Sequence, residues 1–300
     1  MQIVNLLDLN ETGHDTTIAL GNFDGLHLAH QALIKEAIEF SKANFISSSV
    51  LLFNQHTNLL NDKTFRELTP FSYKCSLIEN YGINNIYTIP FNNEIMQMMP
   101  KDFLELLTKK LRLKYIVIGN DYRFGRNRRG DIDFLKKFAK NNAIEVKIID
   151  DIKIDNLKIS STKIRELISK GNLSFANQML GREYMLRGKV VHGKGFGKQF
   201  GFATANLELS DNFLIPKEGV YKTHVLYENK LYNAVTSVGR NLTFNESDLR
   251  IESHILNFNK TIYGEILDLF FVDYIRPMIK FENSIDLIKQ MKTDLLAWSK

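Results

Sequence analysis

The chain has 300 residues, of which 44% are hydrophobic, and a formal net charge of +5. It is long enough for two domains, and it has neither an apolar run that could cross a membrane nor the basic start and apolar stretch of a signal peptide. One cysteine, Cys75, excludes an internal disulfide framework and cannot make a zinc site by itself, so we expect a cytoplasmic protein. Its basic residues are spread out except for a cluster at 123–129, which fits small anions at least as well as nucleic acid.

The first half alternates strand-like and helix-like segments. Such alternation is typical of βαβ units with a parallel sheet. Apolar runs predict strands over 16–20, 46–53, 85–91, 114–119 and 144–149, and helical periodicity predicts helices over 31–38, 72–81, 101–111 and 131–141.

Near residue 183 the pattern changes, because strand signals now follow one another closely. The strands are expected at 185–192, 202–209, 220–227, 230–238, 250–256 and 264–271. Glu228-Asn229 fits a tight hairpin between two of them, and a final helix is expected from about Ser284 to Trp298. We predict a boundary at 180–185, with domains 1–182 and 183–300. The second is a small antiparallel barrel or sandwich closed by the last helix.

A glycine-bounded turn, Gly21–Gly25, lies between the first predicted strand and the first predicted helix. In an open α/β sheet, ligands bind at the carboxyl ends of strands, and a helix N-terminus offers N–H groups to phosphate. His27 and His30 follow the turn and can donate hydrogen bonds to phosphate oxygens together. A His-x-x-His by itself also fits one core and one surface histidine. The strand-turn-helix context favours the phosphate site.

Two more segments follow predicted strands at the same sheet edge. His56 comes after the second strand. The loop 119–131 follows the fourth strand and combines Asp121 with several arginines, whose planar guanidinium binds two phosphate oxygens at once. Taken alone, His56 also fits an ordinary loop histidine, and the loop 119–131 also fits a solvated basic turn.

A third segment, Ser160-Ser161-Thr162-Lys163-Ile164-Arg165, has the composition of a helix start. Ser160 and Ser161 suit the N-cap position, which places Thr162 and Arg165 near the first turn. Arg165 would then reach a phosphate at that helix end. A plain helix start fits the same residues.

The second half carries a glycine-rich segment, 192–201, followed by Ala203-Thr204-Ala205-Asn206. It is neither a P-loop nor a Rossmann fingerprint, and a glycine-rich barrel hairpin is an alternative. Thr204 and Asn206 alternate along a strand, so both point to one face, where their oxygens are suited to Mg²⁺ and nucleotide phosphates. Glu252 shares a strand face with Arg250 and His254, although a lone strand glutamate is usually solvated.

The order and spacing of these motifs resemble a known family. The turn with its histidines, Gly119–Gly125 and Ser160–Arg165 look like the nucleotidylyltransferase module of the prokaryotic bifunctional riboflavin kinase/FAD synthetases. The glycine-rich loop with Ala203–Asn206, together with Gly219-Val220-Tyr221 and Tyr263-Gly264, resembles the riboflavin kinase module. The match extends over essentially the whole chain.

The resemblance implies a Rossmann-like α/β domain (a parallel sheet with helices), followed by an antiparallel β-barrel with a C-terminal helix. It implies a transferase with two steps. The C-terminal domain phosphorylates riboflavin to FMN with ATP, releasing ADP. The N-terminal domain then transfers the adenylyl group of a second ATP to FMN, giving FAD and pyrophosphate. Each step would use Mg²⁺. No nucleic-acid or membrane partner is expected, and the protein is expected to be a monomer or a weak homo-oligomer.

The resemblance also implies residue roles. Catalytic residues would be Glu252, as the base that takes a proton from the ribityl hydroxyl, with His27, His30 and Arg165 in the adenylyl site. ATP and FMN in the adenylyl site would be bound by Gly21, Asn22, Phe23, Asp24, Gly25, His56, Asp121, Arg128, Ser160, Ser161 and Thr162. ATP and riboflavin in the kinase site would be bound by Gly193, Lys194, Gly195, Gly197, Thr204, Asn206, Tyr221 and Arg240, with Thr204 and Asn206 contacting the metal.

Three positions depart from the family's usual residues. Ala29 stands for a glycine between the two histidines, Gln55 for a proline beside His56, and Ala203 for a proline beside Thr204. Two alternatives follow: an enzyme that retains one activity, and a flavin-binding regulator that contacts RNA through residues 123–129.

Overall fold

The computed structural model describes residues 1–193, 202–240 and 249–298. The chain divides into two compact units, Met1–Ser161 and Thr162–Lys300. This division falls after the first residue of α6 (Ser161–Lys170), whereas the predicted boundary at 182/183 follows both α6 and α7 (Leu173–Leu180). Among the described residues, no helix is both long and apolar enough to cross a membrane.

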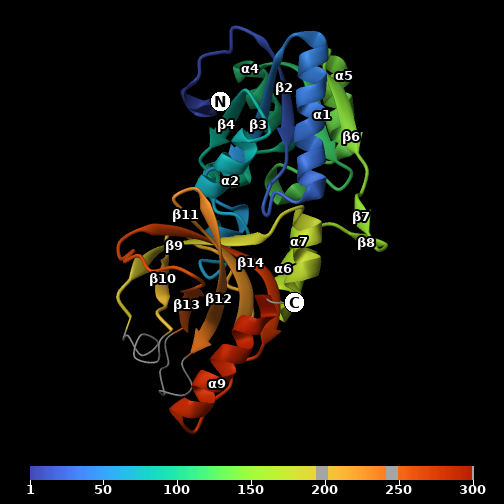
Figure 1. The fold of residues 1–300 in the computed structure, drawn as a ribbon. Coiled ribbons are helices and arrows are strands. Elements are labelled where there is room, and N and C mark those ends of the chain that lie inside the picture. The colour runs from blue at the N-terminus through green and yellow to red at the C-terminus, as the bar shows by residue number, and fades with distance from the viewer. Residues whose placement is uncertain (194–201, 241–248, 299–300) are drawn as a thin grey trace. The chain divides into compact units, whose positions relative to one another are not determined.

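A parallel sheet organises the first unit (Figure 1). Its strands are β1 (Gln2–Asn5), β2 (Asp15–Leu20), β3 (Ser47–Phe53), β4 (Asn85–Ile89), β5 (Arg112–Gly119) and β6 (Glu145–Ile149), in the order β1-β4-β3-β2-β5-β6. All neighbouring strands run parallel. The predicted parallel sheet is thereby confirmed, and β1 is an edge strand that the apolar pattern did not indicate.

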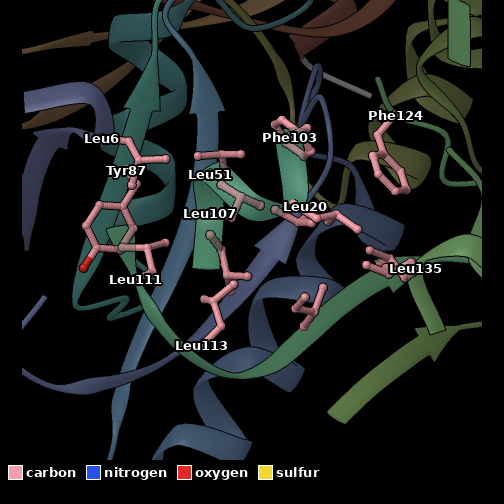
Figure 2. Packing of buried hydrophobic residues seen from close by; sticks show 14 of the residues in the cluster. Leu6, Leu20, Leu51, Tyr87, Phe103, Leu107, Leu111, Leu113, Phe124 and Leu135 are labelled. Carbon is pink, nitrogen blue, oxygen red and sulfur yellow. The ribbon is translucent and has the colours of Figure 1, made fainter. Parts of the chain in front are cut away.

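Helices cover both faces of this sheet because its strands alternate their buried side chains between two cores. Ile18 and Leu20 of β2 belong to one cluster, whereas Ala19 faces the other. The first cluster packs against α3 (Asn93–Gln97), α4 (Pro100–Lys110) and α5 (Ile132–Asn141), and Figure 2 shows its Leu-rich centre. The second packs against α1 (Leu28–Asn44) and α2 (Phe71–Glu79).

The strand order places a topological switch point beside β2. From β2 the chain moves through β3 to β4 on one side, and then crosses to β5 and β6 on the other. Ligands bind at the carboxyl ends of strands at such a point. The loops that follow β2, β3 and β5 all leave from this edge, so the topology brings together 21–27, 54–56 and 120–130, as the sequence predicted.

The second unit contains a closed antiparallel barrel in the order β10-β13-β12-β11-β14-β9 (Figure 1). Its strands are β9 (Tyr184–Val191), β10 (Ala205–Leu209), β11 (Gly219–Tyr227), β12 (Lys230–Arg240), β13 (Leu249–Ile255) and β14 (Ile266–Arg276). The barrel settles the choice between barrel and sandwich. Glu228 and Asn229 both adopt positive φ, 48° and 59°, as a tight β-hairpin turn requires.

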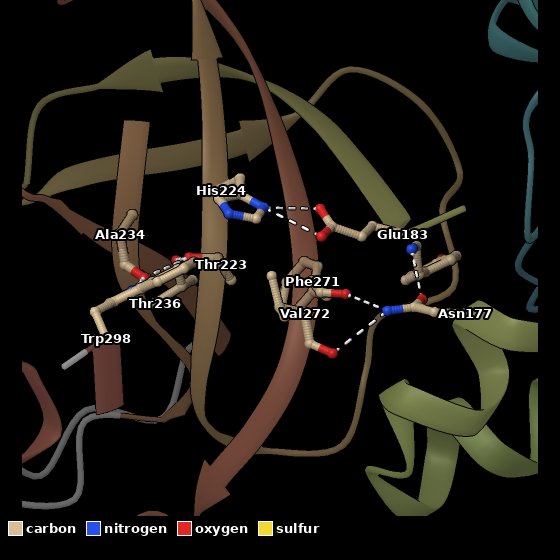
Figure 3. A network of polar contacts seen from close by, with 10 residues as sticks. Asn177, Glu183, Thr223, His224, Ala234, Thr236, Phe271, Val272 and Trp298 are labelled. Atoms are coloured by element: carbon tan, nitrogen blue, oxygen red, sulfur yellow. Dashed lines mark hydrogen bonds and ion pairs between the residues drawn. The ribbon is translucent and has the colours of Figure 1, made fainter. Parts of the chain in front are cut away.

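Polar side chains tie the barrel together inside and at its ends (Figure 3). In the interior, the Thr223 and Thr236 hydroxyls lie 2.8 Å apart, and Thr236 donates to Ser253 at 3.0 Å. All three residues are fully buried, so each hydroxyl depends on its neighbours for hydrogen bonding. Asn177 of α7 donates to the carbonyl of Phe271 on β14 at 2.8 Å and accepts from the backbone of Tyr184 on β9.

The predicted C-terminal helix is present as α9 (Ser284–Leu295), followed by the 3-10 turn Leu296–Trp298. Trp298 donates its indole N–H to the Ala234 carbonyl on β12 (Figure 3). Smaller elements complete the chain: a hairpin of β7 (Lys153–Ile154) and β8 (Leu157–Lys158), and 3-10 turns at Leu6–Asp8, Thr57–Leu60 and Arg126–Arg128.

Candidate active sites

The turn between β2 and α1 is strained. Phe23 and Leu26 have φ of 50° and 42°, although neither is glycine, and Gly25 has φ of 82°. Left-handed backbone is costly for side chains of this size. The turn keeps this shape because Phe23 and Leu26 are buried in the core beneath α1. Strain of this kind is concentrated at ligand sites.

His27 and His30 lie together at the N-terminus of α1. Their rings stack with centroids 3.7 Å apart and planes 14° apart. His27 is the N-cap of α1, and its Nδ1 accepts the backbone N–H of His30 at 3.4 Å. An Nδ1 that accepts leaves the ring proton of a neutral histidine on Nε2, so His27 is oriented to donate from Nε2. Ala29 lies in the first turn of α1 with helical backbone, where a methyl group is tolerated.

Asp24 connects several segments around this turn. Its carboxylate Oδ1 accepts the backbone N–H groups of Leu68 and Thr69 at 3.0 and 3.2 Å. Its backbone carbonyl accepts the Ser161 hydroxyl at 2.8 Å. Asp24 is 1% exposed, so this carboxylate acts within the protein. Residues 67–69 carry no recognisable motif, so their part in this turn was not predicted.

His56 lies next to Asp24, with its Nε2 3.9 Å from Oδ2. The His56 Nδ1 accepts the backbone N–H of Asn58 at 3.1 Å, and its ring stacks on Phe65 at 4.4 Å. The loop around it lacks prolines but is fastened to the end of β4. Gln55 donates to the Phe91 carbonyl at 2.6 Å, and Asn54 accepts from the Phe91 backbone N–H at 3.1 Å.

In the loop after β5, the charged residues are exposed, and Asp121 is paired with a lysine from outside the loop. Lys158 of β8 bridges Asp121 at 2.7 Å and Asp151 at 2.8 Å. The hydrogen bond from Lys158 lowers the pKa of the Asp151 carboxyl below its usual range. Arg128 is exposed and has φ of 57°. Asp121 is therefore held by a lysine that the sequence reasoning did not single out.

The predicted helix start near residue 160 is present. Helix α6 begins at Ser161, so Ser160 directly precedes it and Thr162 lies in its first turn. Arg165 is four residues after Ser161, which places both on one side of the helix. The Ser161 hydroxyl is the one bonded to Asp24.

On the barrel, Asn206 and Glu252 are direct cross-strand partners on β10 and β13. Their neighbours Ala205, Ile251 and Ser253 are buried inside the barrel, so Asn206 and Glu252 point to its outer face, where both are half-buried. Directly paired side chains have Cβ atoms about 5 Å apart. The structure thus brings an amide and a carboxylate together that lie 46 residues apart in the chain.

The segment that leads into β10 is fitted closely to this face. A Cβ built on Gly193 would lie 2.3 Å from the Asn206 Nδ2, so any larger residue here would displace that amide. Thr204 is half-buried two residues before Asn206. His254 donates from Nδ1 to the Ala203 carbonyl at 2.8 Å, which fixes the position where the family usually has proline. Lys194, Gly195 and Gly197 lie outside the described residues.

Two more predicted kinase residues lie away from this face. Tyr221 is fully buried in the barrel interior, where its hydroxyl donates to the Lys217 carbonyl and burial raises its pKa. Arg240, at the end of β12, is exposed and lies 3.6 Å from the Glu218 carboxylate. Their binding roles stay predictions.

The fold and these two sites define a two-part nucleotide-dependent transferase. A family model described as FAD synthetase matches residues 9–163, and one described as riboflavin kinase matches residues 180–300. The chain belongs to the bifunctional riboflavin kinase/FAD synthetase family, as its motifs suggested.

Relatives agree over nearly the full length. The bifunctional riboflavin kinase/FMN adenylyltransferase of Listeria monocytogenes is 34% identical, covering 94% of this chain and 91% of its own. The bifunctional riboflavin kinase/FMN adenylyltransferase of Buchnera aphidicola subsp. Acyrthosiphon pisum is 33% identical, and the match covers 98% of this chain and 95% of that protein. A crystal structure described as a macrolide-efflux protein from Streptococcus pneumoniae is 32% identical with a TM-score of 0.89, covering 98% and 96%.

Proposed function

We propose that the outer barrel face around Asn206 and Glu252 is where this bifunctional enzyme phosphorylates riboflavin. The observation that carries this assignment is the direct pairing of the two residues across β10 and β13. In the reaction, the Glu252 carboxylate accepts the proton of the ribityl hydroxyl. That oxygen bonds to the γ-phosphorus of ATP, and the bond from this phosphorus to ADP breaks.

The residues on this face also suit Mg²⁺. Mg²⁺ prefers oxygen ligands and is held by few protein groups together with substrate phosphates. Asn206 and Thr204 offer an amide oxygen and a hydroxyl beside the Glu252 carboxylate, and the glycine at 193 leaves room at the Asn206 amide. We assign Mg²⁺ to Thr204 and Asn206, where it would offset the phosphate charge of ATP.

The adenylyl transfer belongs at the turn between β2 and α1. The FMN phosphate is already an anion, so it attacks the α-phosphorus of ATP without a strong base, and pyrophosphate leaves. His27 and His30, stacked at the N-terminus of α1, are positioned to donate hydrogen bonds to phosphate oxygens as charge moves to the leaving group. Ser160 and Ser161 would supply further donors, and His56 and Asp24 would order the loop beside them; the roles of Thr162 and Arg165 stay predictions.

A pair of variants tests both assignments. Glu252→Gln should abolish FMN formation from riboflavin, while supplied FMN is still converted to FAD. The double variant His27→Ala/His30→Ala should show the opposite pattern, with FMN accumulating and no FAD. The flavins are separated over time after incubation with ATP and Mg²⁺. If either variant impaired both steps equally, or neither, the corresponding assignment would be wrong.

We also propose that the enzyme is cytoplasmic, that it is monomeric or weakly self-associating, and that it has no nucleic-acid partner. Within residues 123–129, Arg123 is paired with Asp131 at 3.1 Å, and the other three arginines are exposed. Sedimentation at micromolar concentration and a salt-dependent RNA-binding assay would test these two expectations.

A further inference from the structure

A buried lysine lies beneath the adenylyl turn and has no role in the reaction as described so far. Lys74 is in the first half of α2 and is 3% exposed. It shares the buried side of that helix with Cys75 and Ile78. Lysine is almost never fully buried unless it is paired, so its partner needs to be identified.

The Lys74 ammonium has little to offset its charge in the protein. Its Nζ donates to the Asn22 carbonyl at 3.4 Å, which is a long hydrogen bond, and Asn22 is part of the turn between β2 and α1. Within the part of the chain that the structure describes, no carboxylate oxygen lies within 4.0 Å of this nitrogen. An ammonium has three donors, and a buried charge without an opposite charge is strongly unfavourable.

The nearby carboxylate of the turn is already engaged elsewhere. Asp24 accepts the backbone N–H groups of Leu68 and Thr69 through Oδ1, and its Oδ2 faces His56 at 3.9 Å. The positive charge of Lys74 therefore adds to the N-terminal dipole of α1 and to its two histidines. All three features favour an anion at the same turn.

We propose that Lys74 is a phosphate-binding residue of the adenylyltransferase site, where its ammonium offsets the charge of a phosphate group of ATP or FMN. The inference rests on the proposed location of that site at the β2–α1 turn. Lys74 takes no part in proton transfer. As the FMN oxygen bonds to the α-phosphorus and the bond to pyrophosphate breaks, the ammonium stabilises the phosphate charge electrostatically.

The test compares three variants of the full-length enzyme. Lys74→Met removes the charge at similar length, and Lys74→Arg restores it. Lys101→Met is the matched control, because Lys101 is 70% exposed and pairs with Glu105 on its own helix, at 3.5 Å. For each, we would measure FMN adenylylation with varied ATP and FMN, riboflavin phosphorylation, and the thermal midpoint with and without inorganic pyrophosphate.

A charge-assisted hydrogen bond predicts that Lys74→Met lowers kcat/KM for adenylylation by about 10- to 100-fold. Riboflavin phosphorylation should be unchanged, and stabilisation by pyrophosphate should shrink if the group bound belongs to ATP. A raised KM for ATP identifies the triphosphate, and a raised KM for FMN identifies the flavin phosphate. Without ligand, Lys74→Met should melt no lower than the wild type, because an unpaired buried charge has been removed. Lys74→Arg should recover most of the activity.

Wild-type adenylylation kinetics in Lys74→Met would overturn the proposal. So would a lower melting temperature with unchanged KM values, kcat and pyrophosphate response, since that marks a purely structural lysine. The His27→Ala/His30→Ala variant distinguishes failure of the Lys74 inference from failure of the proposed adenylyl site. If it abolishes adenylylation while Lys74→Met does not, only the Lys74 inference fails. If neither affects adenylylation, the site itself lies elsewhere.

Discussion

At the scale of single residues, the kinase site depends on one glycine. A Cβ at position 193 would come within 2.3 Å of the Asn206 side chain. Gly193→Ala should therefore push the amide away from Glu252 and lower kcat/KM for riboflavin phosphorylation by about 100-fold, as misplacement by an ångström does elsewhere. Adenylylation of supplied FMN should be unaffected, and both rates are read from separated flavins.

The matched control is Gly13→Ala, where the added methyl would meet nothing within 4 Å and φ is not restricted to glycine. Both activities should remain at the wild-type level in this variant. A Gly193→Ala enzyme with normal kinase kinetics would show that the Asn206 amide does not need its observed position.

Asp24 illustrates how one side chain can hold several segments of the chain together around a turn. Asp24→Ala would leave the buried N–H groups of Leu68 and Thr69 without their acceptor, which we expect to destabilise the fold by about 2–4 kcal/mol. Asp24→Asn keeps an oxygen acceptor and should cost less. Urea unfolding, monitored by far-UV circular dichroism, measures the free energy of unfolding of both variants. Equal losses of stability in the two variants would contradict this explanation.

Cys75 should be chemically inert in the folded protein. It is 6% exposed, and burial raises the pKa of its thiol from 9.0 to about 11. A thiol-specific reagent at pH 8 should therefore modify it only after unfolding. Because the unfolded thiol ionises first, the free energy of unfolding should fall as pH rises from about 9 to 11. Rapid labelling of the native protein would contradict the assigned burial.

At the scale of elements, α9 is held on the barrel by a buried ion pair. Arg276 of β14 donates to both carboxylate oxygens of Asp294 at 2.9 and 2.7 Å, and Asp294 is 4% exposed. Asp294→Ala would leave the guanidinium without its partner, so we expect a loss of about 3–5 kcal/mol. Denaturant unfolding of the full chain measures this.

The exposed pair between Lys101 and Glu105 provides the comparison, since their side chains are 70% and 53% exposed. Glu105→Ala should change stability by less than about 1 kcal/mol. If the two substitutions had similar effects, the pair between Arg276 and Asp294 would not be what fastens α9.

The sequence predicted those elements that have a clear period and a stop signal. The turn after β2, the helix starting near Ser161 and the hairpin at Glu228-Asn229 all follow from local residue chemistry. The edge strand β1 and the five-residue helix α3 were missed because four or five residues show no measurable period. Helix α7, which ends just before the change of pattern near residue 183, was not predicted.

Much of the site could not be predicted, because it depends on contacts between distant segments. The motif residues were found by their type and spacing. The Asp24 contacts with 68–69 and the buried position of Lys74 required the fold. The fold was also needed to see how the protein accommodates the three departures from the family pattern. Helical backbone accommodates Ala29, while Gln55 and His254 replace the rigidity of missing prolines with hydrogen bonds to Phe91 and Ala203.

At the scale of the whole molecule, the two reactions belong to separate compact units. We expect FMN made by the riboflavin kinase unit to be released before it is adenylylated, in which case the two steps can occur in different molecules. A mixture of Glu252→Gln with His27→Ala/His30→Ala should convert riboflavin to FAD, although neither variant does so alone. A lag in FAD formation should shorten as protein concentration rises. FMN without FAD in the mixture would show that the intermediate is passed within one chain.

The closed barrel has a consequence for how the protein would self-associate when stressed. Its described strands pair all the way round, which leaves no row of free backbone groups to recruit a strand from another molecule. The open sheet, by contrast, ends at β1 and β6. β1 is only four residues long, and β6 exposes Glu145 and Lys147, features that discourage edge-to-edge pairing. On heating, aggregation by strand pairing should therefore involve the open sheet rather than the barrel, and only once these edges loosen, so substrates bound at the β2–α1 turn should delay it by stabilising the first unit.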